Sequence, residues 1–430
     1  MNRTPSEDAG TLPAARRDAD HRPHAALPVA LLNGERAATG AAPVEGGVRL
    51  SLREQARRAE LLQGLLAEQD LDALVIVGND YRGHKGTLRW VADYNLGHRH
   101  GFAFVAPGRD PELILPQNLA LAPASQGWST PVRYARRAAQ GVANAIGELP
   151  RRDRVGIVGL GEILRVADFE LLQRSHPGTQ FVDASAGFEV LRAHKSAEEL
   201  AGVRESTYIA ERCFARLLEI VRPGITEREV AAEMYKTMYL LGGEDPLFLS
   251  MSAVPQPDGT APPRWNALRD RVLHVGDQFV FSFELIGPLG YWMEFARAVV
   301  FGTPNDQQRR LNAACADGMR AAAERMRPGA TPESVQRGML DAVERHGARS
   351  TYWSGHGLGQ DVLEEPWIGH EVVDTETDAG WELAENMVLA MHPFVTDPQE
   401  GGIAYMANSY IVTQAGGEPV SQVPLDIHVV

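Results

Sequence analysis

Apolar and polar residues alternate with different periods along the chain, and the changes of period mark the elements that the sequence predicts. From residue 52, LREQARRAELLQGLLAEQ repeats apolar residues at helical spacing, and LDALVIVG then forms the apolar run of a buried strand. The runs GFAFVAPG, PELILPQ, RVGIVGLG and FVDAS predict further strands between helical segments. Residues 46–190 are therefore predicted to form an α/β domain, and residues 1–45, which show neither period, a flexible N-terminal tail.

A second domain, residues 191–430, is predicted from renewed helical spacing and from an internal echo of sequence. The segment RPGITEREVAAEM at Arg222–Met234 returns as RPGATPESVQRGM at Arg327–Met339. In both segments a helix ends at Arg-Pro-Gly and a threonine, Thr226 or Thr331, caps the next helix. We interpret the echo as a duplication that places two related halves around a central cleft; the alternative is two independent joints with similar capping chemistry.

The segment FSFELIGPLGYWMEFAR, residues 281–297, predicts a hairpin that carries two carboxylates in apolar surroundings. Strand alternation puts Ser282 and Glu284 on one face of the first strand and the phenylalanines on the other. A glycine–proline turn leads to a second strand that contains Glu294. The two glutamates are candidates for metal ligands, for acid–base catalysts or for buried charges with a structural partner, for which Arg297 is the nearest choice.

Composition excludes several classes of function. The formal net charge of −14 and the absence of a long Lys/Arg run argue against a nucleic-acid partner. Only Cys213 and Cys315 occur, so no disulfide framework is expected. No apolar run reaches the length of about 18 residues that a membrane span needs, and the N-terminus lacks a secretory pattern. We therefore expect a cytoplasmic enzyme.

Five motifs from residue 191 onward carry a family resemblance. They are LRAHKSAEELAGVRES, GDQFVFSFELIGPLGYWMEFAR, SGHGLGQDVLEEPWIG, ENMVLAMHPFV and ANSYIVTQAGGE. In this order they resemble the pita-bread superfamily of creatinase, aminopeptidase P and methionine aminopeptidase, the peptidase M24-like proteins. The resemblance implies a creatinase-like α/β N-terminal domain and a C-terminal pita-bread α+β domain with a pseudo-twofold internal repeat.

The same motifs depart from the two-metal members of this superfamily. By resemblance, the first aspartate position falls at Ser282, the second falls at Glu294, and His356 is kept. The remaining ligand positions are occupied by Trp265, Leu363, His392, and Ala407 or, with a shift of one residue, Asn408. Two divalent cations need about five clustered ligands with shared carboxylates, so the resemblance does not extend to two-metal proteolysis.

The predicted catalytic groups are Glu284, Glu294, His356 and His392. Our main hypothesis is a metal-free site without a cofactor, resembling creatinase and ectoine hydrolase. A histidine relays a proton while the glutamates hold a cationic group. The reaction is hydrolysis of a C–N bond in an amidine, guanidine, ureido or amide group of a small polar molecule. Alternatively, Glu294, His356 and His392, with or without Glu284, hold one Fe, Mn or Zn ion, as in a dimethylsulfoniopropionate lyase-like or Xaa-Pro peptidase-like enzyme. A third hypothesis is a non-catalytic binding module.

Further residues are predicted to contact the substrate. In the C-terminal domain these are Arg264, Trp265, Tyr291, Arg297 and Asn408. Resemblance to creatinase-like dimers implies a homodimer in which the N-terminal domain of one subunit covers the cleft of the other. The N-terminal residues that could reach a cleft in this way are Tyr81, Arg82, His84, His98 and His100.

Overall fold

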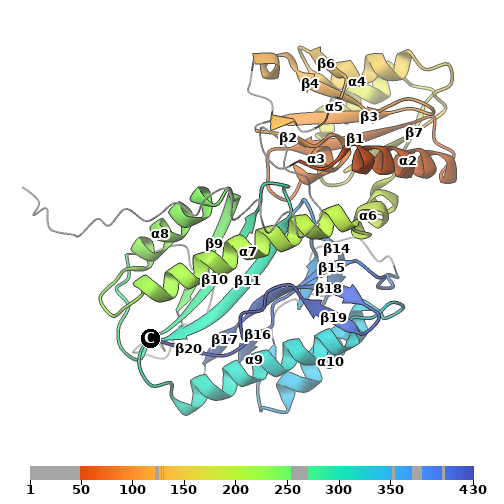
Figure 1. Cartoon of the computed structure of the whole chain (residues 1–430). Helices are drawn as coiled ribbons and strands as arrows, with labels where there is room; N and C mark the ends of the chain where they lie inside the picture. Colours follow the sequence, from red (N-terminus) through yellow and green to blue (C-terminus); the bar gives the residue numbers. More distant parts are fainter. Residues whose placement is uncertain are drawn as a thin grey trace, which may run out of the picture. The chain divides into compact units, whose positions relative to one another are not determined.

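The computed structural model describes residues 49–97, 99–121, 125–126, 128, 130–252, 270–350, 354–369, 380–399 and 402–430. The described chain has an N-terminal α/β domain and a C-terminal domain in which helices cover a large sheet (Figure 1), which confirms the predicted fold class. The predicted N-terminal tail lies outside the described residues.

The N-terminal domain is built on a mixed sheet whose strand order is β6-β4-β3-β1-β7-β8. Two apolar clusters, one on each side of the sheet, contain residues from β1, β3, β4 and β7. The strands are β1 (Ala73–Asn79), β3 (His100–Val105), β4 (Glu112–Pro116), β6 (Val132–Ala135), β7 (Arg154–Val158) and β8 (Gln180–Asp183), with β2 (Tyr94–Asn95) and β5 (Ser125–Gln126) paired separately. The helices are α2 (Leu52–Glu68), α3 (Gly86–Ala92), η1 (Gln117–Leu121), α4 (Ala138–Gly147), α5 (Val166–Ser175) and α6 (Ser185–Ala193).

The C-terminal domain is built on a sheet whose main path is β14-β13-β15-β18-β11-β10-β9, with β19 beside β18 and β20 beside β11. Its strands are β9 (Glu244–Ser252), β10 (Gln278–Ile286), β11 (Trp292–Val300), β13 (Gly355–Gly357), β14 (Glu364–Ile368), β15 (Val388–Met391), β18 (Ala407–Thr413), β19 (Gly416–Pro419) and β20 (His428–Val429). A smaller sheet contains β12 (Arg349–Ser350), β16 (Phe394–Thr396) and β17 (Ile403–Tyr405).

Two helix pairs cover one face of the large sheet (Figure 1). They are α7 (Ala197–Ile220) with α8 (Glu227–Leu240), and α9 (Asp306–Arg325) with α10 (Pro332–Glu344). The first pair packs on β10 and β11, and the second on β15 and β18. The predicted caps are confirmed, because Thr226 forms a capping box and Thr331 caps a helix that begins with proline. The echoed segments therefore occupy equivalent joints of the two helix pairs.

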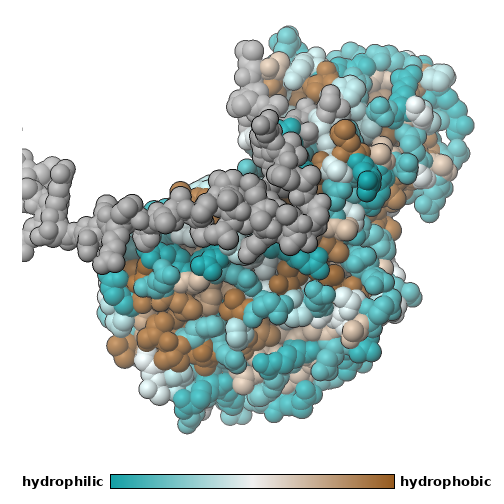
Figure 2. All heavy atoms as spheres, viewed as in Figure 1, coloured by the Kyte–Doolittle hydropathy of each residue, from teal (hydrophilic) through white to brown (hydrophobic). Residues whose placement is uncertain are grey.

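Polar residues dominate the face seen in Figure 2, with hydrophobic residues gathered mainly on the C-terminal domain. None of the helices in the described part of the chain is long and apolar enough to cross a membrane.

Candidate metal centre

The β10–β11 hairpin presents its two faces to different surroundings. Glu284 and Glu294 are direct cross-strand partners, so their side chains share one face of the sheet. Phe281, Phe283 and Phe295 belong to the other face and pack in the apolar cluster under α7 and α8. The strand alternation that predicts this division is thus enforced by burial of the phenylalanines, which leaves the glutamates on the face without helices.

His356 and Glu294 approach each other across residues with small side chains. His356 in β13 pairs with Ala390 in β15, and Ala390 pairs with Ser409 in β18. Ser409 lies beside Glu294, whose backbone N–H donates to its Oγ at 3.1 Å. Because alanine and serine project little from the sheet, the two long side chains can converge above them. His392 follows β15 directly and joins the same face.

The three side chains form a tight, buried group. His356 Nε2 lies 2.9 Å from Glu294 Oε1, and His392 Nε2 lies 3.9 Å from Glu294 Oε2. The centroids of the two imidazole rings are 5.2 Å apart. One donor atom from each of Glu294, His356 and His392 lies within 4.8 Å of the others. Among the described residues these are the ones that could share a metal ion.

The hydrogen bonds of His356 fix its tautomer. Its Nδ1 lies 2.8 Å from the carbonyl oxygen of Gly357, which can only accept, so Nδ1 carries a proton. Nε2 of the neutral ring therefore offers a lone pair toward Glu294, and the short contact between them requires a shared proton or another cation. Burial opposes the imidazolium, but Glu294 and the Gly357 carbonyl outweigh it and raise the pKa of His356.

The same surroundings lower the pKa values of both His392 and Glu294. Burial and the neighbouring His356 lower the pKa of His392 to about 4, so its ring is neutral at pH 7. Burial alone would raise the pKa of Glu294, but the two imidazoles outweigh it and lower that pKa. Oε2 of Glu294 is buried and has no hydrogen-bond partner among the described residues. Such an arrangement combines an ionised carboxylate with imidazole lone pairs, which is a donor set for a divalent cation.

Glu284 lies beside this group without belonging to it. Its side chain is 6% exposed, and no described residue forms a hydrogen bond or ion pair with its carboxylate. Burial raises the pKa of Glu284, the charge of Glu294 raises it further, and Arg82 acts in the opposite direction. The carboxylate is therefore an acceptor next to the candidate centre to which no described residue donates.

The glycines on either side of His356 have a packing role. A Cβ atom on Gly355 would lie 2.1 Å from the carbonyl oxygen of Ala390, and one on Gly357 would lie 2.1 Å from that of Glu365. Both positions therefore need glycine so that β13 can approach β15 and β14 closely. The Gly-His-Gly pattern aims the imidazole by fixing the strand spacing.

Aromatic side chains that the sequence analysis missed lie around the two histidines. Trp367 lies beside His356 with ring centroids 5.7 Å apart, and Tyr405 stacks on His392 at 6.3 Å. Phe394 contacts Tyr405 in turn, at 6.4 Å between centroids. These aromatic residues lie in separate short strands, so no sequence pattern could have predicted that they gather around the two histidines.

Three predicted substrate contacts have other partners. The hydroxyl of Tyr291 contacts Arg58 and Glu199, which lie in α2 and α7. Arg297 donates to the backbone carbonyls of residues 296, 407, 423 and 424, and thereby ties the C-terminal segment to β11 rather than pairing with Glu294. Asn408 pairs with Phe295, on the helix-covered face, where it lines a cavity of about 710 Å³ between α9, β18, β19 and the C-terminal segment.

The N-terminal candidates are only partly described. Arg82 donates to the carbonyl of Pro246 at 3.4 Å, and its own carbonyl accepts from the N–H of Val362. It therefore lies against the C-terminal domain of its own chain, close enough to influence Glu284. Tyr81 is 58% exposed. His98, Arg264 and Trp265 lie outside the described residues.

The pairing of the strands also shows which of the remaining ligand positions of two-metal members hold residues that cannot bind a metal ion here. Ala407 pairs with Ala296 and so shares the face of Glu294, which places the last ligand position of the two-metal members at an alanine. Ser282 of β10 pairs with the same Ala296 from the opposite edge of β11, and the side chain of Leu363 offers no donor atom. Glu294, His356 and His392 fit one ion, but the described chain lacks the shared carboxylates that two ions would need.

Comparison with known proteins agrees with this architecture. Residues 201–414 match the Metallopeptidase family M24, and residues 58–194 match the Creatinase/Prolidase N-terminal domain. The chain belongs to the M24 pita-bread family. This M24 chain is 25% identical to an Xaa-Pro dipeptidase of Lactobacillus helveticus over 62% of its own length and 70% of the relative. It is 29% identical to the probable dipeptidase PepE of Mycobacterium bovis over 56% of its length and 61% of the relative.

The solved structures show the same fold. An X-Pro aminopeptidase from Thermotoga maritima MSB8 superposes with a TM-score of 0.72 at 20% identity, covering 86% of this chain and 99% of that one. Dipeptidase PepE from Mycobacterium ulcerans superposes with a TM-score of 0.71 at 22% identity, covering 89% and 99%. At these identities the likeness establishes the fold of the M24 chain.

These findings correct two predictions. The expectation of a metal-free site was wrong, because the chain belongs to a metallopeptidase family and its structure gathers three buried groups suited to an ion. A non-peptide C–N bond as the substrate finds no support, since the relatives are named as peptidases and dipeptidases. The family supports a hydrolase, whereas the homodimer, the cytoplasmic location and the roles of individual site residues stay predictions.

Proposed function

We propose that this chain is a single-metal M24 hydrolase that cleaves an amide bond in a small peptide, as the names of its Xaa-Pro dipeptidase relatives suggest. The observation that carries the proposal is the buried group of Glu294, His356 and His392, with donor atoms within 4.8 Å of one another. Its relatives' names, Xaa-Pro dipeptidase and dipeptidase, supply the substrate class.

The side chains present favour an ion over a purely organic site. A cation would take the place of the proton between His356 Nε2 and Glu294 Oε1. It would also provide a partner for Oε2, to which no described residue donates a hydrogen bond. Two imidazoles and one carboxylate suit Zn, Fe or Mn. When bound, such an ion acts as a Lewis acid toward a carbonyl oxygen and lowers the pKa of water.

Residues around the centre would position the substrate. Glu284 is a buried acceptor without a hydrogen-bond donor in the described part of the chain. We assign it to the ammonium group of the peptide, where a charge-assisted hydrogen bond restores its ionised form. Tyr405, Phe394 and Trp367 offer flat apolar surfaces on the histidine side, which suit the ring of a proline residue. Arg82, which lies near Glu284, remains a proposed contact for a substrate carboxylate.

Metal titration combined with a peptide assay tests the proposal. Protein stripped with a chelator is titrated with Zn²⁺, Mn²⁺ and Fe²⁺, and each form is assayed on Xaa-Pro dipeptides and on matched dipeptides without proline. We expect one ion per chain and hydrolysis that depends on that ion. Two equivalents of tightly bound metal, or hydrolysis that persists after complete metal removal, would refute the single-metal mechanism.

A matched pair of histidine variants identifies the ligands. His392→Ala removes a proposed ligand, whereas His346→Ala removes a half-buried histidine that pairs with Asp317 at 2.9 Å, outside the metal centre. Metal binding and hydrolysis should both fall in the His392 variant and stay unchanged in the His346 variant. Equal metal affinity in the two variants would exclude His392 from the ligand set.

A further inference from the structure

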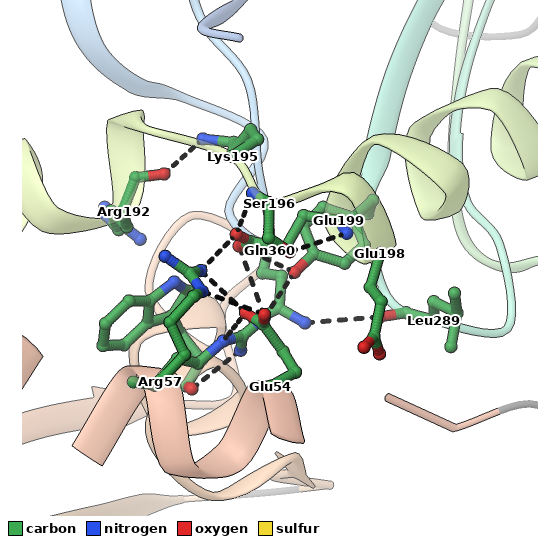
Figure 3. A network of polar contacts seen from close by, with 12 residues as sticks. Glu54, Arg57, Arg192, Lys195, Ser196, Glu198, Glu199, Leu289 and Gln360 are labelled. Carbon is green, nitrogen blue, oxygen red and sulfur yellow. Dashed lines mark hydrogen bonds and ion pairs between the residues drawn. The ribbon is translucent and has the colours of Figure 1, made fainter. Parts of the chain in front are cut away.

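Arg58 of α2 is fully buried and connects the N-terminal domain to the turn of the β10–β11 hairpin. Figure 3 shows the polar contacts of its neighbours Glu54, Arg57 and Glu199. Its Nη2 donates to the hydroxyl of Tyr291 at 2.7 Å, its Nε to Glu54 at 2.7 Å, and its Nη1 to the carbonyl of Trp90 at 2.8 Å. The guanidinium also lies 5.1 Å from the ring centroid of Trp90 and 5.3 Å from that of Trp128. Contacts on all these sides hold the guanidinium in one orientation.

Tyr291 is held from a second direction by α7. Its hydroxyl accepts from Arg58 and donates to Glu199 at 3.0 Å, so both hydrogen-bonding capacities of the hydroxyl are used. Arg57 bonds both Glu54 and Glu199, which balances two arginines against two carboxylates. Arg57 does this without contacting Tyr291 in any described interaction, and it is 32% exposed.

The turn that Tyr291 occupies leads directly into the candidate metal centre. Tyr291 precedes β11 and stands three residues before Glu294. The N–H of Trp292 donates to the carbonyl of Gly359 at 2.7 Å, which joins the start of β11 to the segment that follows His356. A shift of the turn would therefore move Glu294 relative to His356.

We propose that Arg58 is a positioning residue of the metal centre, which sets the distance between Glu294 and His356 by fixing Tyr291 at the hairpin turn. The proposal rests on the proposed function in that it treats Glu294 and His356 as ligands. A buried ion cluster contributes little more stability than apolar packing would, because desolvation offsets its attraction. Its hydrogen bonds are directional, however, and groups that orient ligands commonly change metal affinity when they are removed.

Two double variants test this role against a merely structural one. Arg58→Met with Glu54→Gln, and Arg57→Met with Glu54→Gln, each remove one arginine and neutralise one carboxylate, so both leave one arginine facing Glu199. Only the first removes the contact with Tyr291. We expect the Zn²⁺ dissociation constant, measured by competition with a chromophoric chelator, to rise about 10-fold or more in the Arg58 variant. In the Arg57 variant it should stay within about twofold of the original protein.

A metal-independent measurement separates this proposal from the proposed function. In metal-free protein labelled with ¹⁵N-histidine, the imidazole resonances of His356 report its hydrogen bond to Glu294. They should shift in the Arg58 variant and in Tyr291→Phe, which alters no charge, and stay in place in the Arg57 variant. If the original protein binds no metal, the proposed function fails while these resonances still decide the role of Arg58. Unchanged resonances and Zn²⁺ affinity in folded Tyr291→Phe would overturn the proposal, even if the Arg58 variant does not fold.

Discussion

Glu294→Gln separates metal binding from folding, because the amide keeps the shape of the side chain and loses its charge. Glu294 is 4% exposed, and its oxygens lie 2.9 Å and 3.9 Å from the Nε2 atoms of His356 and His392. Removing the carboxylate removes an interaction with the strength of a charged hydrogen bond, about 3 kcal/mol. This corresponds to a dissociation constant for the ion that is roughly 100-fold larger.

The fold of the metal-free protein should tolerate the same change. Since Nδ1 of His356 donates to Gly357, the amide N–H of glutamine can donate to Nε2, which replaces a charged hydrogen bond by a neutral one. The expected loss is about 1–2 kcal/mol of the free energy of unfolding. The raised pKa of His356 makes that loss depend on pH. The ion pair stabilises fully below the unfolded pKa of about 6.5, and this contribution disappears as the pH rises through the higher folded value.

Isothermal titration with Zn²⁺ and urea denaturation of the metal-free protein, at pH 6 and pH 8, measure the two effects independently. The variant should bind the ion roughly 100-fold more weakly, and its loss of stability should be smaller at pH 8 than at pH 6. Zn²⁺ binding within threefold of the original protein would show that Glu294 is not a ligand. A metal-free variant that is unfolded at pH 8 would show that the carboxylate has a structural partner instead.

Four further expectations follow from the same contacts. Metal binding displaces the proton between His356 and Glu294, so the apparent dissociation constant measured by titration should rise about tenfold for each pH unit below the pKa of His356; a pH-independent constant would contradict this. Glu284→Gln should raise KM for dipeptides with a free amino group and leave KM for N-acetylated ones unchanged, and equal effects on both would remove its assignment to the ammonium group. Arg297→Met leaves buried carbonyls without donors, so urea denaturation should show a loss on the order of 3 kcal/mol, whereas a loss near zero would mean that the C-terminal segment is held by other contacts. Burial raises the pKa of Cys213 to about 12 and that of Cys315 further, so neither thiol should react with a disulfide reagent at pH 8 until urea unfolds the protein; rapid reaction of the native chain would show that these helices open readily.

The elements and the fold class could be predicted because local chemistry specifies them. The capped helices after each Arg-Pro-Gly follow from threonine side chains that bond nearby backbone N–H groups, and these are interactions within a few residues. The two faces of the 281–297 hairpin follow from strand alternation, which puts Phe281 and Phe283 on one face and Glu284 on the other. Both features survive in any tertiary setting that buries the apolar face.

The partners of the polar residues could not be predicted in the same way. Tyr291 and Arg297 sit next to the candidate centre in sequence, yet their hydrogen bonds run to α2, α7 and the C-terminal segment. Asn408 and Ala407 differ by one position, and only the pairing of β18 with β11 shows which of them shares the face of Glu294. A shift of one residue in a strand exchanges its faces, so sequence spacing alone left that choice open.

The sequence by itself indicated the family, the helix caps, and Glu294, His356 and His392 at positions where, by resemblance, two-metal members keep ligands. The tertiary structure decided that Glu294, His356 and His392 converge within 4.8 Å while Glu284 stays beside them. The physical reason is that strand alternation fixes only the face on which a side chain lies. The distance between side chains on different strands depends on the order of the strands and on the small residues between them. It also depends on buried contacts that hold the turns, such as the contact of Arg58 with Tyr291.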